Sequence, residues 1–441
     1  MILSLRRHPM QLHRVVCSLV LVFVLCINGF AEDSLNVQQA IALTLRQNQA
    51  LLANEALVRA AQARVHQTES ADYPMVGISG DLTGIGPIPA FSFPGYGSIA
   101  LAPASNLDLH VGAAYTIYDF GKRNAREDVA KSSVSGPEDA SKSMRSALTQ
   151  QTIQAFFGVI FLRRSVAVQQ EQIDAFVEHL QDTRRKVESG SATEFDSLST
   201  SVRVAQARNQ KIDLERALDD QEVSLRRLIG LAWDGPLTLT GTFTSGDADE
   251  SVETLLLQAK EHRPDLVTAR DIVATAKLGS TGAHHGDDPS LLVHASYGLR
   301  NGFEPNLDVA RGNWSVGASV EVPVFDGFLT RSRIEEADAM VLASERHLAD
   351  VDRTAEAEVR QAFAAVRSAR AKINATDLQV VQAIKAVENA RIRYQSGAGT
   401  NLDILDAETS ASTSRLQQLQ ALYQLVLAQT SLQAAVGLFA R

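Results

Sequence analysis

The stretch that decides the fold is RYQSGAGTNLDILDA, residues 393–407, which has a second version 207 positions earlier in KVESGSATEFDSLST, residues 186–200. In both versions a Ser-Gly pair is followed, six residues after the glycine, by an aspartate. Glycine adopts left-handed backbone angles at little steric cost and is the usual residue just past the end of a helix. Each stretch therefore predicts that one helix ends, the chain turns sharply and a second helix begins.

The same offset relates other parts of the chain. Two further pairs of dipeptides match at 207 positions without a gap: Tyr118-Asp119 with Phe325-Asp326, and Gly230-Leu231 with Gly437-Leu438. Upstream, residues 37–51 resemble residues 252–266 at an offset of 215. Similarity over this length indicates an internal duplication. We therefore divide the chain into a first repeat at 32–232, a linker at 233–250 and a second repeat at 251–441.

The two halves share one predicted order of elements: a helix, two strands, a long helix, the sharp turn and a further helix. Segments rich in good helix formers define the helices, at residues 36–72, 121–189 and 194–229 in the first half and 252–285, 327–396 and 400–437 in the second. Gly136-Pro137 predicts a kink or local break in the first long helix, because proline interrupts the helical hydrogen bonds. Its counterpart in the second half has no such break.

Helix lengths predict how these elements stack. The 70 residues of 327–396 would span roughly 105 Å at about 1.5 Å per residue. The two shorter helices of each half add up to nearly the length of its long helix. Within 402–437, apolar or small residues recur at three- and four-residue spacing, which is typical of a coiled-coil seam. The sequence therefore predicts a rod or tube wall roughly 100 Å tall.

Four further segments alternate apolar and polar residues with the two-residue period of a β-strand. They are residues 76–82, 107–117, 291–299 and 313–322, the first being the weakest. A half-buried sheet in a soluble protein has the same period, but strands of about 10 residues also suit a tilted membrane crossing. Asp108 and His110 on the polar face suit a watery lumen. Two hairpins cannot close a barrel, so the strands predict a β-barrel shared by several chains.

Residues 1–31 are predicted to be a secretory signal peptide. They hold three arginines and no acidic residue, then an apolar run at 15–27, then small residues before Glu32. The apolar run is too short to cross a bilayer. Both cysteines, Cys17 and Cys26, lie in this segment, so no disulfide is expected in the exported chain. No later apolar stretch approaches the roughly 20 residues of a transmembrane helix, so any membrane span is expected to be a β-barrel.

Composition and motifs exclude several classes of protein. The 42 Lys and Arg against 51 Asp and Glu give a formal charge of −9, which does not suit a nucleic-acid binder. No HExxH, P-loop, GxSxG or Rossmann pattern is present, so neither an enzymatic activity nor a cofactor is expected. His284 and His285 lie near two aspartates just before Pro289, where a solvated loop rather than a metal site is expected.

At this point the chain resembles the outer membrane efflux protein family, the TolC-like exit ducts of tripartite pumps. The resemblance covers nearly the whole chain after residue 31. It is carried by the duplicated turns, by the Tyr-Asp-Phe-Gly121 and Phe-Asp-Gly327 junctions between strand and helix, and by Arg263-Pro264-Asp265-Leu266. The stretch at 393–407 is its most specific part. Each motif alone is weak evidence, whereas the full order in two copies is strong.

The resemblance implies a mainly α fold with a small β part. It implies a homotrimer in which each protomer gives four strands to one transmembrane β-barrel, continued through the periplasm by a long coiled-coil helical barrel. The implied location is the outer membrane of a Gram-negative bacterium, and the implied partners are outer-membrane lipid, a periplasmic adaptor and an inner-membrane pump. The implied function is passive passage of small molecules such as drugs or toxic compounds from the periplasm to the exterior.

The resemblance also implies roles for individual residues. Gly190 and Gly397 match the periplasmic tip turns where adaptors dock, while Tyr394, Asp403 and Asp406 match positions that constrict the closed tunnel. Asp196 matches an acidic tip position of the first half, and rings of carboxylates from three chains would make a polar, cation-sensitive gate. Gly399 stands where well-known relatives carry an arginine that bonds these groups.

Alternatives stay open for these residues and for the function. The three aspartates can instead be N-terminal helix carboxylates that stabilise the helix dipole, and Tyr394 can simply pack between helices. Within the family, a duct for type I secretion of proteins or peptides is the main competitor. A different class, a periplasmic coiled-coil structural or adaptor protein, predicts no barrel at all.

Overall fold

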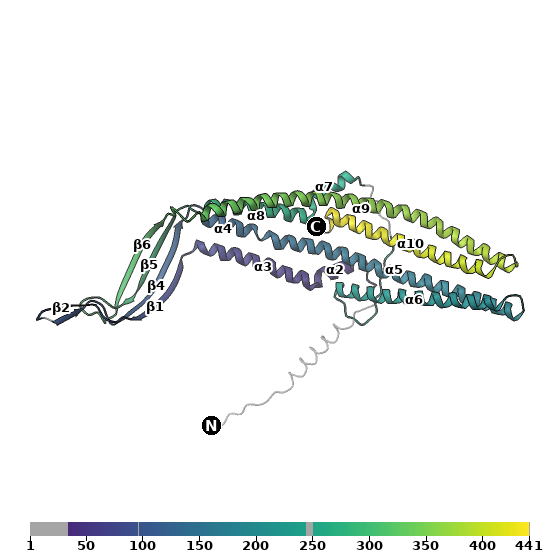
Figure 1. The fold of residues 1–441 in the computed structure, drawn as a ribbon, viewed down its shortest axis with the longest axis horizontal. Coiled ribbons are helices and arrows are strands. Elements are labelled where there is room, and N and C mark those ends of the chain that lie inside the picture. The colour runs from purple at the N-terminus through teal and green to yellow at the C-terminus, as the bar shows by residue number, and fades with distance from the viewer. Residues whose placement is uncertain (1–33, 96, 244–249, 441) are drawn as a thin grey trace, which may run out of the picture. The chain divides into compact units, whose positions relative to one another are not determined.

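A computed structural model describes residues 34–95, 97–243 and 250–440 (Figure 1). The predicted signal peptide at 1–31 lies outside the described residues. The described chain forms two compact units, one from residues 34–46, 151–243 and 373–426 and the other from 47–150, 250–372 and 427–440. Each unit takes segments from both halves of the sequence, so the division into repeats at 32–232 and 251–441 stays a prediction.

The chain is mainly helical with a small β part, as predicted. The helices are α2 (Val37–Gln47), α3 (Gln49–Glu69), α4 (Lys122–Ser132), α5 (Ser135–Glu188), α6 (Glu194–Ile229), α7 (Val252–His262), α8 (Pro264–His284), α9 (Leu329–Gln395) and α10 (Asn401–Val436), with short 3-10 turns η1 (Ser70–Asp72) and η2 (Leu438–Ala440). The 67-residue α9 confirms the uninterrupted second long helix. Among the described residues, no helix combines the length and apolar character needed to cross a membrane.

The predictions of a single helix at 36–72 and of another at 252–285 are wrong, because each helix is broken in the middle. Between α2 and α3, Asn48 leaves the helical conformation at ψ 118°, and its side chain accepts a hydrogen bond from the backbone N–H of Ala50. Between α7 and α8, Arg263 is extended at ψ 121° because Pro264 follows it. Asn48 and Arg263 are 215 positions apart, the offset seen in the sequence, so the break is itself duplicated.

The break predicted near Gly136-Pro137 is confirmed. Helix α4 ends at Ser132 and α5 begins at Ser135, so Pro137 lies in the first turn of α5. A proline costs little there because the first backbone N–H groups of a helix have no intrahelical partner.

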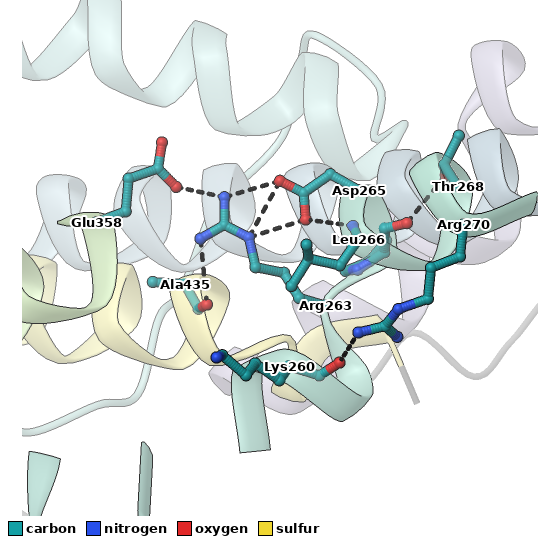
Figure 2. Close-up of polar contacts among 9 residues, drawn as sticks. Lys260, Arg263, Asp265, Leu266, Thr268, Arg270, Glu358 and Ala435 are labelled. Atoms are coloured by element: carbon teal, nitrogen blue, oxygen red, sulfur yellow. Dashed lines mark hydrogen bonds and ion pairs between the residues drawn. The ribbon is translucent and has the colours of Figure 1, made fainter. Parts of the chain in front are cut away.

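Arg263 organises the second break through a cluster of charges, shown in Figure 2. Arg263 itself is buried, at 8% exposure. Its guanidinium donates to both carboxylate oxygens of Asp265, with Nε 2.8 Å from Oδ1 and Nη2 2.8 Å from Oδ2. It also pairs with Glu358 of α9 and donates through Nη1 to the Ala435 carbonyl oxygen of α10 at 3.4 Å. One side chain therefore ties the start of α8 to α9 and α10.

The four strands β1 (Met75–Gly84), β4 (Ser105–Tyr118), β5 (Ser290–Arg300) and β6 (Arg311–Glu321) form one antiparallel sheet in the order β1-β4-β5-β6. The predicted strands are confirmed, and β4 pairs with β5 to join the two halves. Between β1 and β4 lies a small hairpin that the sequence did not reveal, β2 (Ala90–Phe93) with β3 (Gly97–Ala100).

The two faces of the sheet differ as the alternation predicted. One face carries large exposed apolar side chains, among them Ile78 at 77%, Tyr297 at 69% and Trp314 at 74% exposure. On the other face Ser79 hydrogen-bonds to His110 at 2.9 Å. Within the described chain, β1 and β6 each have one unpaired edge.

Gly298 of β5 is expected to be essential for the pairing that joins the two halves. It faces His110 of β4, and a Cβ there would overlap the Leu109 carbonyl oxygen and lie 2.6 Å from His110 Cα. We expect Gly298→Ala to cost about 1–3 kcal/mol through this overlap, seen as a lower apparent melting temperature of the purified protein. The control is Gly77→Ala in β1, where a Cβ meets no atom within 4 Å. Equal melting temperatures of Gly298→Ala and Gly77→Ala would show that the β4–β5 pairing does not require a glycine at position 298.

A pair of aspartates, Asp139 and Asp271, lies where α5 starts. Asp139, 1% exposed, accepts from Lys142 Nζ at 2.8 Å through Oδ1, while its Oδ2 has no hydrogen-bond partner among the described residues. Asp139 and Asp271 of α8 line one cavity of about 410 Å³. Burial, and then the Asp139 carboxylate, raise the pKa of Asp271 above its ordinary value. Ionised Asp271 therefore destabilises the fold, and this cost is absent below the ordinary pKa of aspartate.

We expect Asp271→Asn to be more stable than the natural chain at pH 7, because the amide removes a partly buried charge beside the Asp139 carboxylate and can donate to that carboxylate. The advantage should shrink as the pH falls towards about 4, where Asp271 of the natural chain is protonated. Melting curves between these pH values check this, with the exposed neighbour Glu138→Gln as the control. An Asp271→Asn variant that gains nothing at pH 7 would show that the carboxyl is not under strain.

Candidate functional site

The two sharp turns predicted from the sequence are confirmed as equivalent structures. Helices α5 and α6 form one hairpin and α9 and α10 form another, and Figure 1 shows both turns at the same end of these helices. Gly190 has φ +73° and Gly397 has φ +78°, so both take the left-handed conformation. We call the two pairs of helices the tip hairpins.

Asp196 and Asp403 both cap the helix that follows the turn. Asp196 accepts from the backbone N–H of Thr193 at 3.0 Å, and Asp403 accepts from that of Thr400 at 2.9 Å. In return each threonine hydroxyl accepts from the aspartate's own N–H. This reciprocal arrangement is a capping box. The hydrogen bonds from the Thr400 backbone and side chain lower the pKa of the exposed Asp403 carboxyl, which therefore stays ionised.

Asp406 lies one turn further along α10 and makes a different contact. Its carboxylate is 59% exposed and lies 3.3 Å from the guanidinium of Arg203 on α6. This ion pair joins the two tip hairpins, although exposed pairs of this kind contribute little to stability. Arg203 is a contact that the sequence did not reveal, because it has no counterpart in the matched motifs.

Tyr394 packs near the end of α9. Its ring contacts the edge of His179 with centroids 5.2 Å apart, and Lys186 Nζ lies 3.7 Å from its centroid. The hydroxyl is buried without a hydrogen-bond partner in the part of the chain that the structure describes. Within one chain, therefore, the contacts of Tyr394 are those of a side chain packed between helices.

Gly399 is enclosed by the turn. A Cβ at this position would lie 3.0 Å from the Tyr394 backbone nitrogen and 3.1 Å from Arg393 Cβ. A larger side chain therefore needs a small shift of the α9 terminus. In this chain the arginine that contacts Asp406 is Arg203 of α6, and position 399 carries no side chain.

The histidine pair at the end of α8 forms local contacts. His284 Nδ1 lies 2.8 Å from the Ser280 carbonyl oxygen, and His285 Nδ1 lies 2.6 Å from Asp288 Oδ2. Over the described ranges, no three His, Cys, Asp or Glu side chains are grouped so as to hold a metal ion.

Comparison with known proteins identifies this arrangement of hairpins and sheet. The family model described as "Outer membrane efflux protein" matches residues 40–231 and 255–438. The chain belongs to the outer membrane efflux protein family. A member of this family is a passive outer-membrane channel that extends into the periplasm, not an enzyme.

Relatives agree over most of the length. The chain is 23% identical over 435 residues to "Outer membrane protein TolC" of Escherichia coli (strain K12), covering 94% of this chain and 85% of that protein. It is 26% identical over 320 residues to "Alkaline protease secretion protein AprF" of Pseudomonas aeruginosa, covering 71% and 65%. The crystal structure of the Campylobacter jejuni CmeC outer membrane channel superposes with a TM-score of 0.79 at 17% identity, covering 91% and 85%. These likenesses confirm the fold class.

Proposed function

We propose that three copies of this chain form the outer-membrane exit duct of a tripartite efflux system, closed at the tip hairpins by side chains of this chain. The observation that carries the proposal is the pair of equivalent turns, each followed by an acidic capping box. The sheet supports it as well, because four strands with one exposed apolar face and two free edges cannot close on themselves.

The gate is formed by Asp403 and Asp406, with Tyr394 and Asp196 beside them. Asp403 and Asp406 are exposed in the single chain, so both carboxylates can face a shared opening, although Asp406 also pairs with Arg203. The capping role of Asp403 is compatible with this, because a carboxylate that accepts from one N–H still has a second oxygen for a cation. Three chains would bring six such carboxylates to one aperture and make it sensitive to multivalent cations.

The partners follow from the position of the turns. Gly190 and Gly397 form the turns of the tip hairpins, and by analogy with the family a periplasmic adaptor docks at these turns. The duct has no energy source of its own, so an inner-membrane pump is required to drive export. Both contacts are proposals drawn from the family.

The cargo we propose is small molecules such as drugs or toxic compounds. A second candidate is secretion of a polypeptide, favoured by the similarity to AprF, whose name assigns it to secretion of alkaline protease. The two cargoes need the same duct and differ only in the pump that feeds it.

Deletion of the gene in its native bacterium separates these readings. Loss of small-molecule export predicts susceptibility to a panel of toxic compounds rising about fourfold or more, with the secreted proteins unchanged. Loss of one secreted polypeptide without a change in susceptibility would assign the chain to secretion. A periplasmic structural protein predicts no heat-modifiable trimer in the outer-membrane fraction, so the absence of that trimer would refute the duct.

A further inference from the structure

The tip hairpins of one chain meet at a buried polar cluster that neither capping nor the gate carboxylates account for. It takes one residue from each of the four helices: His179 from α5, Thr200 from α6, Tyr394 from α9 and Asn401 from α10. We call these four residues the tip latch. His179 is 8% exposed, Thr200 0% and Asn401 6%. Buried polar groups cost free energy unless they are hydrogen-bonded, so their partners decide what the cluster does.

Asn401 is the centre of the tip latch. It is the first residue of α10, but Thr400 and Asp403 already form the cap, so its side chain is not needed for that purpose. Its Oδ1 lies 2.6 Å from His179 Nε2. Its Nδ2 lies 3.2 Å from each of three acceptors on α6: the Asp196 carbonyl oxygen, Ser199 Oγ and Thr200 Oγ1. The side-chain amide of Asn401 therefore links the α9/α10 hairpin to both helices of the α5/α6 hairpin.

The duplication shows that this contact is not a general feature of the two hairpins. At the offset of 207 positions, Asn401 corresponds to Glu194, which is exposed. His179 corresponds to Ala386 and Thr200 to Ala407, neither of which offers a polar side chain. Among the described residues this contact is therefore one-sided: the first tip hairpin supplies His179 and the α6 acceptors, and the second supplies Asn401.

The buried ring of His179 favours the neutral form, because burial penalises the charged one. Because the amide oxygen of Asn401 can only accept, His179 Nε2 carries the hydrogen and Nδ1 is the acceptor of the neutral ring. Burial, the largest effect, and Lys186 lower the pKa of His179, whereas Asn401, Asp182 and Glu408 raise it. Charged side chains of α5, α9 and α10 line the adjoining cavity of about 130 Å³: Glu178, Asp182, Lys186, Arg391 and Glu408. Helix α6 faces the latch with the hydroxyls of Ser199 and Thr200.

We propose that Asn401 and His179 are positioning residues of the entrance. They hold the α9/α10 hairpin against the α5/α6 hairpin, thereby fixing the place of Asp403 and Asp406, and this contact weakens when the buried ring of His179 takes up a proton. This inference rests on the entrance function proposed above. A histidine with a depressed pKa contributes stability that is present above its ordinary value near 6.5 and is lost as the pH falls through the lowered value.

Hydrogen–deuterium exchange of the full-length trimer tests the latch without needing a conducting pore. We expect Asn401→Leu to speed exchange of the first turns of α10 at pH 7.5 by about tenfold, after correction for intrinsic rates, because His179 and the α6 groups lose their partner. The matched control is Glu194→Leu, the same change at the equivalent exposed position, which should leave these amides unchanged.

His179→Gln keeps a donor where Nε2 stood but cannot titrate. We expect it to match the natural chain at pH 7.5 and to lack the faster exchange that the natural chain shows at pH 5. A structural role alone would not remove this acid response. The proposal is overturned if Asn401→Leu exchanges no faster than Glu194→Leu, or if His179→Gln keeps the acid response.

Planar-bilayer recordings of the same proteins separate this inference from the proposed function. Asn401→Leu should raise conductance as well as exchange. If exchange responds but conductance changes only on neutralising Asp403 and Asp406, the latch does not position the entrance and that part of the proposal is overturned. If exchange responds and no variant conducts, the entrance function fails while the contact between the tip hairpins stands.

Discussion

Replacing Asp403 and Asp406 together by asparagine is expected to raise the conductance of the purified trimer and to weaken its block by multivalent cations roughly tenfold or more. Six negative charges leave the proposed aperture, and opposite charges at about 4 Å attract by several kcal/mol at the dielectric of a partly enclosed site. Asparagine keeps an acceptor for the Thr400 N–H that Asp403 binds at 2.9 Å, so the cap is retained. The change therefore isolates charge from helix stability.

The control for this experiment removes two charges elsewhere on the tip hairpins. Asp219 and Asp220 are exposed on α6, about 35 Å along the helix from Asp196. Their replacement by asparagine should leave the conductance and the block unchanged. If the two double variants behave alike, Asp403 and Asp406 serve only as helix N-terminal carboxylates and the gate lies elsewhere.

Loss of the Arg263 side chain is expected to produce the largest loss of stability in the helical part. Arg263→Ala removes the guanidinium that joins Asp265, Glu358 and the Ala435 carbonyl oxygen, and it empties a buried volume at the break between α7 and α8. The two carboxylates are close to half exposed, so water recovers part of the loss. We expect a cost of about 2–3 kcal/mol, at the lower end for a broken buried ion pair. Lower outer-membrane yield and an earlier melting transition would report it.

Arg270 of α8 provides the matched control. Its guanidinium donates to the Lys260 carbonyl oxygen at 2.7 Å in an exposed position, as Figure 2 shows. Arg270→Ala should cost little, because exposed contacts of this kind are readily replaced by water. Arg263→Lys should fall between the two, since an ammonium cannot reproduce the fork that binds Asp265 and Glu358 together. Equal melting temperatures of Arg263→Ala and Arg270→Ala would show that Arg263 does not stabilise the break between α7 and α8.

Much of the fold followed from local signals in the sequence. Gly190 and Gly397 marked the turns because few other residues adopt their backbone angles at low cost. The predicted bounds of α6, 194 and 229, match the structure, in which Thr193 caps the start of the helix and Gly230 lies just past its end. The strands followed from their alternation. The break at Arg263 was accessible as well, because Pro264 restricts the residue before it.

Contacts between distant segments were not accessible in this way. The break at Asn48 was not accessible either, because its side chain caps the start of α3 by accepting from the Ala50 N–H, and an asparagine within a helical pattern does not by itself indicate such a cap. The hydrogen bond between His179 and Asn401 joins residues 222 positions apart. Asn401 lies in the stretch at 393–407, but nothing in that stretch points to His179. The roles of Asp196 and Asp403 as caps were among the alternatives, because both follow a turn and lie in the first turn of a helix.

Planar-bilayer recording of the purified, heat-modifiable trimer tests the central claim most directly. The account predicts a small conductance for the natural chain at neutral pH and a larger one when Asp403 and Asp406 are both neutralised, with weaker block by multivalent cations. A folded trimer that carries no current in either form would contradict the claim that this chain is an exit duct closed at its tip hairpins.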